Sequence, residues 1–425
     1  MFGFANALLL LLLAAACLDF VPVLRRRLSP TAWWVEDRPL FCARGAAVRQ
    51  RYGTAAFLLG VMVYEFIVVF NNSMARENWP WLQTRVSPVL DWVMYLCFGF
   101  KILLGTKYNG RSMVCAGLLY FVARWVYFNG QNIWWLGLCV ALLAAKDVPL
   151  RRVMKAFLDC GVPTLALVEL LHFAGIIAPD AASERNGSYR LMFGYGHPNT
   201  FGGLVFGLVL AYALLRAQKV RWVDCLLVFA VGVFLLVGPA SRSAALCTLA
   251  LAVGLVFCRL RAGHSVPRWW PGTCAGMVGL TAAVSYLLPL LVIKVGPWNN
   301  DIGPAWLAKL DSLLTCRISL TWMAYRLLDV KIAGQVFNWP TVDNSFAFAL
   351  FQFGPVVAAL LGILFAAALL GHAKQGRRVE VCCLFAMLAY AYMEVQPFHL
   401  TTNPTALLLC GAVFAQTSAR WQKIE

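Results

Sequence analysis

Long apolar runs constrain this chain more than any other feature of its sequence. Thirteen such runs are separated by short segments that hold most of the charged residues, and most are long enough for a helix to cross a bilayer. Hydrophobic residues make up 61% of the chain and charged residues 13%, whereas about a quarter of the residues of a soluble protein are charged. The sequence therefore predicts an all-α polytopic integral membrane protein with about 12–14 transmembrane helices in a single transmembrane domain, residues 1–425. The expected helices are 4–23, 53–70, 88–105, 113–128, 132–146, 157–178, 199–215, 222–238, 243–259, 272–293, 345–369, 379–395 and 404–419.

The distribution of Lys and Arg predicts the orientation of these helices. With the N-terminus placed outside, 24 Lys and Arg residues fall in the cytoplasmic segments and ten on the opposite side. Lys101 and Arg124 lie within the runs. Because cytoplasmic loops of membrane proteins carry the excess of basic residues, we expect an outer N-terminus and a cytoplasmic C-terminus. The same rule explains the net charge of +17 without nucleic acid, and no basic stretch with interleaved aromatic residues indicates nucleic-acid binding.

One long polar interval, residues 294–344, breaks the apolar pattern. It is predicted to be a large extracytoplasmic loop between two transmembrane helices. The loop is expected to carry short amphipathic helices, and its middle, 310–326, has a helix-like pattern. The chain has no Walker A, G-x-S-x-G, H-E-x-x-H or D-x-D motif and no C-x-x-C pair. No metal site and no cofactor are expected, so a bound diphosphate would be neutralised by Arg, Lys or helix ends.

Arginines on the predicted outer face are candidates for that task. Arg242 follows the turn 238–241 at the start of an apolar run, where a guanidinium can bind phosphate oxygens beside the unpaired N–H groups of a helix. A helix-anchoring arginine at the membrane surface is the alternative. Arg317 lies in the helix-like middle of the loop, where a solvated surface charge is the alternative. Arg326 ends the same stretch and is a candidate for lining the site.

The segment 190–203 joins an outer loop to a helix and carries Arg190, His197 and Asn199. Pro198 and Asn199 are typical of a helix start. A histidine at the positive end of a helix is held neutral, so His197 can exchange a proton, while Arg190 is a third candidate ligand for the diphosphate. The alternative is a structural turn in which Asn199 caps the helix.

Asp343 and Asn344 stand where the long loop meets the next apolar run. A carboxylate here can accept a proton from an attacking hydroxyl, whereas Asp, Asn and Ser at a helix start more often act as caps. Asn344 is accordingly a candidate for lining the site. Glu394 lies near the outer end of its predicted span and is a further candidate for the same site.

The order of these segments resembles a known family. The segments are 191–202, 238–243, 310–317, 342–346 with Gly354, Glu394 and 403–404. Together they resemble Wzy-type polymerases of O-antigen, capsule and exopolysaccharide, within the O-antigen polymerase and ligase group, and the resemblance covers roughly residues 100–415. In the related ligases a His precedes Asn at the end of the large loop. This chain has Asp343 there, which favours a polymerase.

The resemblance implies a metal-independent glycosyltransferase in the bacterial cytoplasmic membrane. Such an enzyme would polymerise undecaprenyl-diphosphate-linked oligosaccharide on the outer face of that membrane. Its partners would be this lipid-linked substrate, membrane lipid, a flippase and chain-length regulator proteins. Arg242 and Arg317 match the arginines that hold the lipid diphosphate in the ligases, and the base is either Asp343 or His197. The alternatives are ligase-like transfer of glycan to another acceptor and a flippase for the same lipid-linked units.

Overall fold

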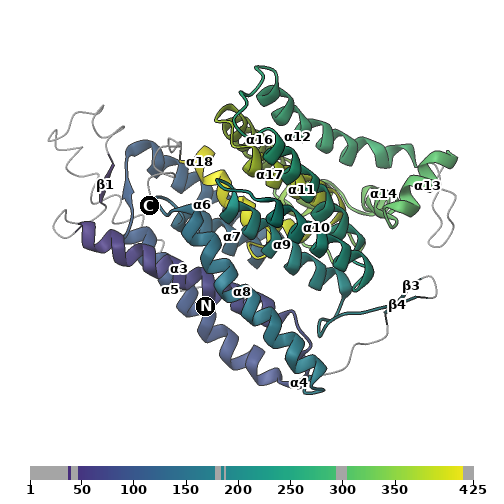
Figure 1. Ribbon diagram of the computed structural model, residues 1–425, viewed down its shortest axis with the longest axis horizontal. Coiled ribbons are helices and arrows are strands. Elements are labelled where there is room, and N and C mark those ends of the chain that lie inside the picture. Colours follow the sequence, from purple (N-terminus) through teal and green to yellow (C-terminus); the bar gives the residue numbers. More distant parts are fainter. Residues whose placement is uncertain (1–36, 40–45, 178–182, 186–187, 293–303, 415–425) are drawn as a thin grey trace. The chain divides into compact units, whose positions relative to one another are not determined.

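The computed structural model describes residues 37–39, 46–177, 183–185, 188–292 and 304–414 (Figure 1). These residues are mostly helical, as expected for an all-α membrane protein. The expected first helix, 4–23, lies outside the described residues. The described chain divides into two compact units, each with its own packing. The first contains residues up to 120, 139–204 and the end of the chain from 413, and the second contains 121–138 and 205–412.

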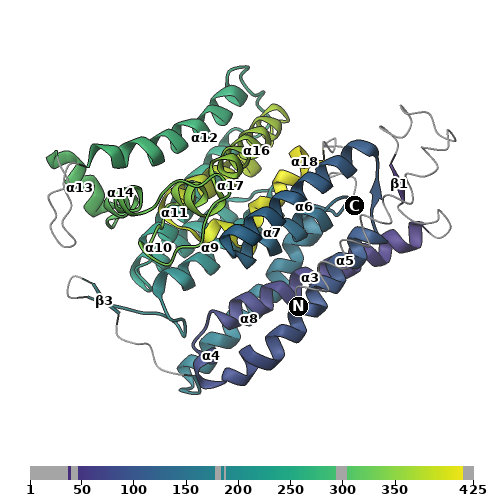
Figure 2. The same ribbon diagram turned by 180° about the vertical axis from the view of Figure 1, so that it is seen from behind.

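The first unit is built around three long helices. Helix α3 (Ala46–Asn71) packs against α5 (Ser87–Leu103) and α8 (Leu150–Phe173), and the three lie side by side in both views (Figures 1 and 2). The rings of Phe57 and Phe98 meet with centroids 5.5 Å apart in this core. Other elements in or entering this unit are α4 (Ala75–Asn78), η1 (Leu82–Val86), α6 (Gly110–Gly130), α7 (Ile133–Ala144), α9 (Pro198–Arg216), β3 (Ser183–Arg185) and β4 (Ser188–Arg190).

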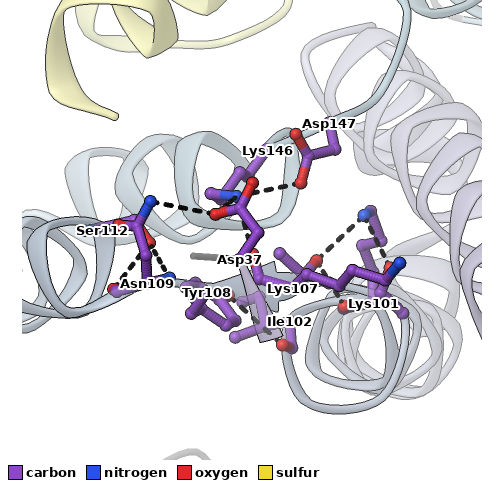
Figure 3. A network of polar contacts seen from close by, with 11 residues as sticks. Asp37, Lys101, Ile102, Lys107, Tyr108, Asn109, Ser112, Lys146 and Asp147 are labelled. Atoms are coloured by element: carbon purple, nitrogen blue, oxygen red, sulfur yellow. Dashed lines mark hydrogen bonds and ion pairs between the residues drawn. The ribbon is translucent and has the colours of Figure 1, made fainter. Parts of the chain in front are cut away.

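A buried polar network joins distant segments of the first unit (Figure 3). Strand β1 (Arg38–Pro39) pairs with β2 (Lys107–Tyr108), and Nζ of Lys146 donates to the carbonyl of Lys107 over 2.7 Å. The same ammonium lies 2.9 Å from Oδ2 of Asp147 and 3.7 Å from Oδ1 of Asp37. A buried ammonium is stable only when it is paired, so this network ties residues 37–39 to the segment 107–147.

The second unit contains the remaining helices. Helix α11 (Arg242–Leu260) packs on α10 (Trp222–Val237) and on α17 (Arg378–Met393), while α12 (Trp270–Leu287) packs on α16 (Pro355–Lys374). The other elements of this unit are η2 (Leu288–Leu291), α13 (Ala305–Leu313), α14 (Arg317–Leu327), α15 (Ser345–Phe348), η3 (Ala349–Phe353), η4 (Gln396–Phe398), η5 (Pro404–Leu409) and α18 (Cys410–Val413).

Seven described helices are long and apolar enough to cross a membrane. Six of them match expected spans, and the seventh, Pro355–Lys374, covers only part of the expected span 345–369. The six are Val48–Asn71, Leu82–Leu103, Leu150–Phe173, Pro198–Arg216, Arg242–Leu260 and Trp270–Leu291. Three shorter apolar helices, Ile133–Ala144, Trp222–Val237 and Pro404–Val413, fall within other expected spans. The protein is therefore of the all-α membrane-spanning class.

The expected helix 345–369 is interrupted in the structure. Gly354 has a φ of +86°, a left-handed conformation that ends the first piece, and Pro355 begins α16. Proline favours the first turn of a helix because its missing N–H needs no partner there. A Cβ on Gly354 would lie 2.2 Å from the carbonyl oxygen of Ile332, so the break also makes room for the loop that precedes Asp343.

Candidate functional site

Helix α14 places Arg317 in a buried setting at its first position. Ile318 packs with Leu307 of α13 and Val292 in a small apolar core, which fixes the first turn of the helix against its neighbours. Arg317 is 8% exposed, and its guanidinium makes three contacts with the chain near the end of α17 and with its own turn. Nε donates to the carbonyl of Met393 over 2.8 Å, and Nη1 donates to that of Thr315 over 3.3 Å.

The third contact joins Arg317 to Glu394. Nη2 of Arg317 donates to Oε1 of Glu394 over 2.7 Å, and Glu394 is itself 5% exposed. Glu394 follows the last residue of α17 and lies outside the candidate spans. Burial raises the pKa of the Glu394 carboxyl, the Arg317 guanidinium opposes the rise, and the Asp343 carboxylate adds to it. Burial has the larger effect, so the pKa of the Glu394 carboxyl is raised despite the ion pair.

Asp343 reaches the same guanidinium from the end of the long loop. Its Oδ2 lies 3.6 Å from Nη1 of Arg317, and its side chain is 25% exposed. Asn344, rather than Asp343, caps the next helix, since its Oδ1 accepts from the backbone N–H groups of Phe346 and Ala347. The capping alternative weighed from the sequence therefore applies to Asn344, and the Asp343 carboxylate lies beside a guanidinium instead.

Helix α11 contributes through its first turn. Oγ of Ser243 donates to Oε1 of Glu394 over 2.9 Å, so one carboxylate oxygen accepts from both α11 and α14. Arg242 is the preceding residue, begins α11 and is exposed. A cation at a helix N-terminus is unfavourable by up to about 1 kcal/mol because the helix dipole is positive there. An anion bound at this point would be attracted by the guanidinium and by the helix end together.

Ser345 completes the cluster, and Arg326 lies apart from these contacts. Oγ of Ser345 donates to the carbonyl of Glu394, which ties α15 to the end of α17. Nδ2 of Asn344 donates to Oγ of Ser285 over 3.2 Å on α12. Arg326 is exposed in the last turn of α14, with its guanidinium 5.3 Å from the ring of Trp322.

The three candidates from 190–203 lie in the first unit. Nη2 of Arg190 donates to Oδ1 of Asn199 over 3.1 Å, and Arg190 is 8% exposed. His197 is exposed, and its Nδ1 accepts from the backbone N–H of Asn199 over 3.1 Å. In a neutral imidazole with Nδ1 accepting, the proton sits on Nε2.

Sequence reasoning did not single out Ser243, Ser345, Ser285 or Asp311 as contributors. Asp311 lay inside the stretch 310–326 that was predicted to be helical, and the break between α13 and α14 that gives it a capping role was not predicted. Within the described ranges, no three His, Cys, Asp or Glu side chains gather as a metal site. The described cluster can hold a carboxylate at a fixed place beside a guanidinium, with an exposed arginine on the adjoining turn.

No family model matches the chain, and comparisons with curated proteins and with solved structures found no match either.

Proposed function

We propose that this protein is a membrane polysaccharide polymerase that joins lipid-linked oligosaccharide repeat units. One observation carries the proposal: residues from four separate segments of the second unit meet in one polar cluster, namely Ser243, Arg317, Asp343 and Glu394. All four segments are among those through which the sequence resembles Wzy-type polymerases. Burying charged side chains costs folding free energy, and such groups are commonly found at binding or catalytic sites.

The proposed reaction transfers the growing glycan to a new repeat unit. A hydroxyl oxygen at the non-reducing end of the acceptor attacks the anomeric carbon of the lipid-linked donor. The bond from that carbon to the diphosphate oxygen breaks, and undecaprenyl diphosphate leaves with the bonding electrons. The hydroxyl proton passes to the Asp343 carboxylate, which acts as general base. Asp343 suits this role because it is partly exposed and makes no helix-capping hydrogen bond.

Arg242 and Arg317 receive different roles. Arg242 is exposed at the first turn of α11, and we assign it direct contact with the diphosphate. Arg317 is mostly buried and already bonded to Glu394, so it supplies a fixed positive charge and orients Asp343. Asn344, Ser345 and Glu394 hold these groups in place. Arg190 remains a candidate diphosphate ligand from the sequence, His197 a candidate proton carrier, and Asn199 and Arg326 candidate lining residues.

The proposal includes the membrane arrangement expected from the sequence. It comprises about 12–14 spans in the bacterial cytoplasmic membrane, with the N-terminus outside and the C-terminus in the cytoplasm. Residues 294–344 then lie outside, where lipid-linked repeat units arrive after a flippase has moved them. Chain-length regulator proteins are expected partners. Arginine side chains supply the charge neutralisation that other glycosyltransferases obtain from a metal ion.

The test is deletion of the protein in its own bacterium, followed by complementation. Deletion should leave single repeat units on lipid outside the cell, and the unchanged protein should restore long chains. A double variant with Arg242→Ala and Arg317→Ala, present at normal level in the membrane, should not restore them. Long chains made by that variant would overturn the proposal. Repeat units trapped inside the cell would indicate a flippase, and polymer accumulating on carrier lipid would indicate a ligase.

A further inference from the structure

Asp311 holds the start of the helix that carries Arg317. Asp311 is completely buried, and its Oδ1 accepts from the backbone N–H of Ile318 over 2.7 Å and of Ser319 over 3.2 Å. Its Oδ2 accepts from the hydroxyl of Ser319 over 2.8 Å. These donors are among the N–H groups that lack partners at a helix start. The residue at the usual capping position, Cys316, makes no such side-chain bond.

The turn between α13 and α14 needs such a contact. Thr315 has a φ of +60° and Cys316 a φ of +63°, two consecutive left-handed residues that are not glycine. This conformation is unfavourable for residues with a Cβ, so it persists only where surrounding contacts impose it. Asp311 contacts both the turn and the residues that follow it, since its carbonyl also accepts from the N–H of Cys316 over 2.8 Å. Arg317 is the next residue along the chain.

We infer that Asp311 is a positioning residue for the reaction: its buried carboxylate fixes the first turn of α14 and thereby directs the Arg317 guanidinium toward Glu394 and Asp343. The inference rests on the proposed function. Asp311 itself contacts no part of that cluster in the described hydrogen bonds, and it acts through the backbone of the residues that follow Arg317. Ser319 joins the two carboxylate oxygens to the same turn.

The turn can be observed without any activity measurement. The backbone N–H groups of Ile318 and Ser319 are bonded to Asp311, so the rate of their hydrogen exchange reports how often the first turn of α14 opens. The rate is measured on the purified full chain in detergent, by mass spectrometry of the peptide that contains these two residues. Asp311→Ala should raise it about five-fold, as expected for loss of a cap, and Asp311→Asn, which keeps one acceptor oxygen, should raise it less. Ser312→Ala changes the exposed neighbouring residue and is the matched control, with an unchanged rate.

Activity then separates positioning from simple stability. At equal amounts of folded protein, Asp311→Ala should lower kcat about 10-fold or more with little change in KM, because a displaced charge is felt mainly in the transition state. In an Arg317→Lys background, the same change should lower kcat less than about two-fold further, since both changes affect one element. A full second loss in that background would overturn the inference, and so would a wild-type exchange rate at Ile318 and Ser319 together with wild-type activity.

The proposed function fails separately from this inference. If deletion of the protein leaves long polysaccharide chains intact while Asp311→Ala still accelerates hydrogen exchange at Ile318 and Ser319, the polymerase assignment is wrong. Asp311 then holds the turn without serving that reaction, and the positioning role is rejected while the structural contact stands.

Discussion

Asp343 lies beside Arg317, with Oδ2 of the carboxylate 3.6 Å from Nη1 of the guanidinium. The neighbouring residue Asn344 takes over the helix cap that an Asp at this place would otherwise supply. This division of tasks leaves the Asp343 carboxylate beside a positive charge, on the exposed edge of a buried cluster. Capping and chemistry can therefore be tested by separate substitutions.

Asp343→Asn should abolish most polymerisation while leaving the fold intact. Removing a general base lowers a rate by about 100- to 10,000-fold. The ion pair with Arg317 is long and partly exposed, so its loss should change the free energy of unfolding by no more than about 1 kcal/mol. The measurements are polysaccharide chain length by gel electrophoresis and thermal unfolding of the purified protein. Asp329→Asn, at an exposed position of the same loop, is the control and should behave as wild type. Near-normal chain length from Asp343→Asn would remove Asp343 as the base.

Asn344→Ala should have the opposite profile. It removes the acceptor for the N–H groups of Phe346 and Ala347, and loss of such a cap costs about 1 kcal/mol. The thermal transition should therefore fall by several degrees while the rate per folded molecule stays within an order of magnitude of wild type. A variant as stable as wild type but inactive would assign Asn344 a direct role in the reaction.

Arg317→Ala should destabilise the protein strongly. It leaves Glu394 buried without its cation, and breaking a buried ion pair costs about 3 kcal/mol or more. Arg317→Lys keeps the charge and should recover part of that free energy. It cannot donate to the Met393 carbonyl and to the Glu394 carboxylate from one planar group as the guanidinium does. Arg326→Ala, which removes an exposed guanidinium from the same helix, should cost less than about 1 kcal/mol. Thermal unfolding in detergent gives the comparison, and equal losses for Arg317→Ala and Arg326→Ala would contradict the buried pair.

The fold was predictable where apolar runs are bounded by polar residues. The expected spans 199–215 and 243–259 correspond closely to Pro198–Arg216 and Arg242–Leu260, because hydropathy alone decides such segments. The expected span 345–369 fails at Gly354 because a left-handed φ is a backbone property that hydropathy does not measure. The Gly354–Pro355 dipeptide carried the local signal for a break.

The candidate site was predictable only in its parts. Arg317, Asp343 and Glu394 were each named from charged residues at ends of apolar runs. Their pairing was not predictable, because Arg317 and Glu394 are 77 positions apart and no periodic pattern links them. The role of Ser243 as a second donor to Glu394 likewise follows from the packing of α11 on α17, which is a tertiary contact.

Arg242→Ala should leave stability unchanged and weaken use of the lipid-linked donor. The side chain is exposed and starts α11, where a cation opposes the helix dipole, so its removal should change the unfolding free energy by less than about 0.5 kcal/mol. Loss of one charge-assisted contact to a diphosphate should lower kcat/KM by about 10- to 100-fold. Arg259→Ala removes an exposed arginine from the other end of α11 and serves as the control. Steady-state rates on donor in nanodiscs measure the difference, and equal behaviour of the two variants would exclude Arg242 from the donor site.

Glu394 should make stability depend on pH in the weakly acidic range. Its pKa in the folded protein is raised by burial above the ordinary value of 4.5, so the native state retains a proton that the unfolded chain releases. The stabilisation from that proton is complete below the unfolded pKa and is lost as pH rises through the folded pKa, so stability contributed by this group falls with rising pH.

Glu394→Gln should remove that dependence. Gln keeps an oxygen that can accept from Ser243 and from Arg317 but cannot ionise, so this variant should lose less stability per unit rise in pH above about 4.5 than wild type does. Apparent melting temperatures of both proteins across this range give the two slopes. Glu77→Gln changes an exposed carboxyl in the first unit and should leave the wild-type slope unchanged. If Glu394→Gln and wild type have parallel profiles, Glu394 stays ionised throughout and the Arg317 guanidinium outweighs burial in setting its pKa.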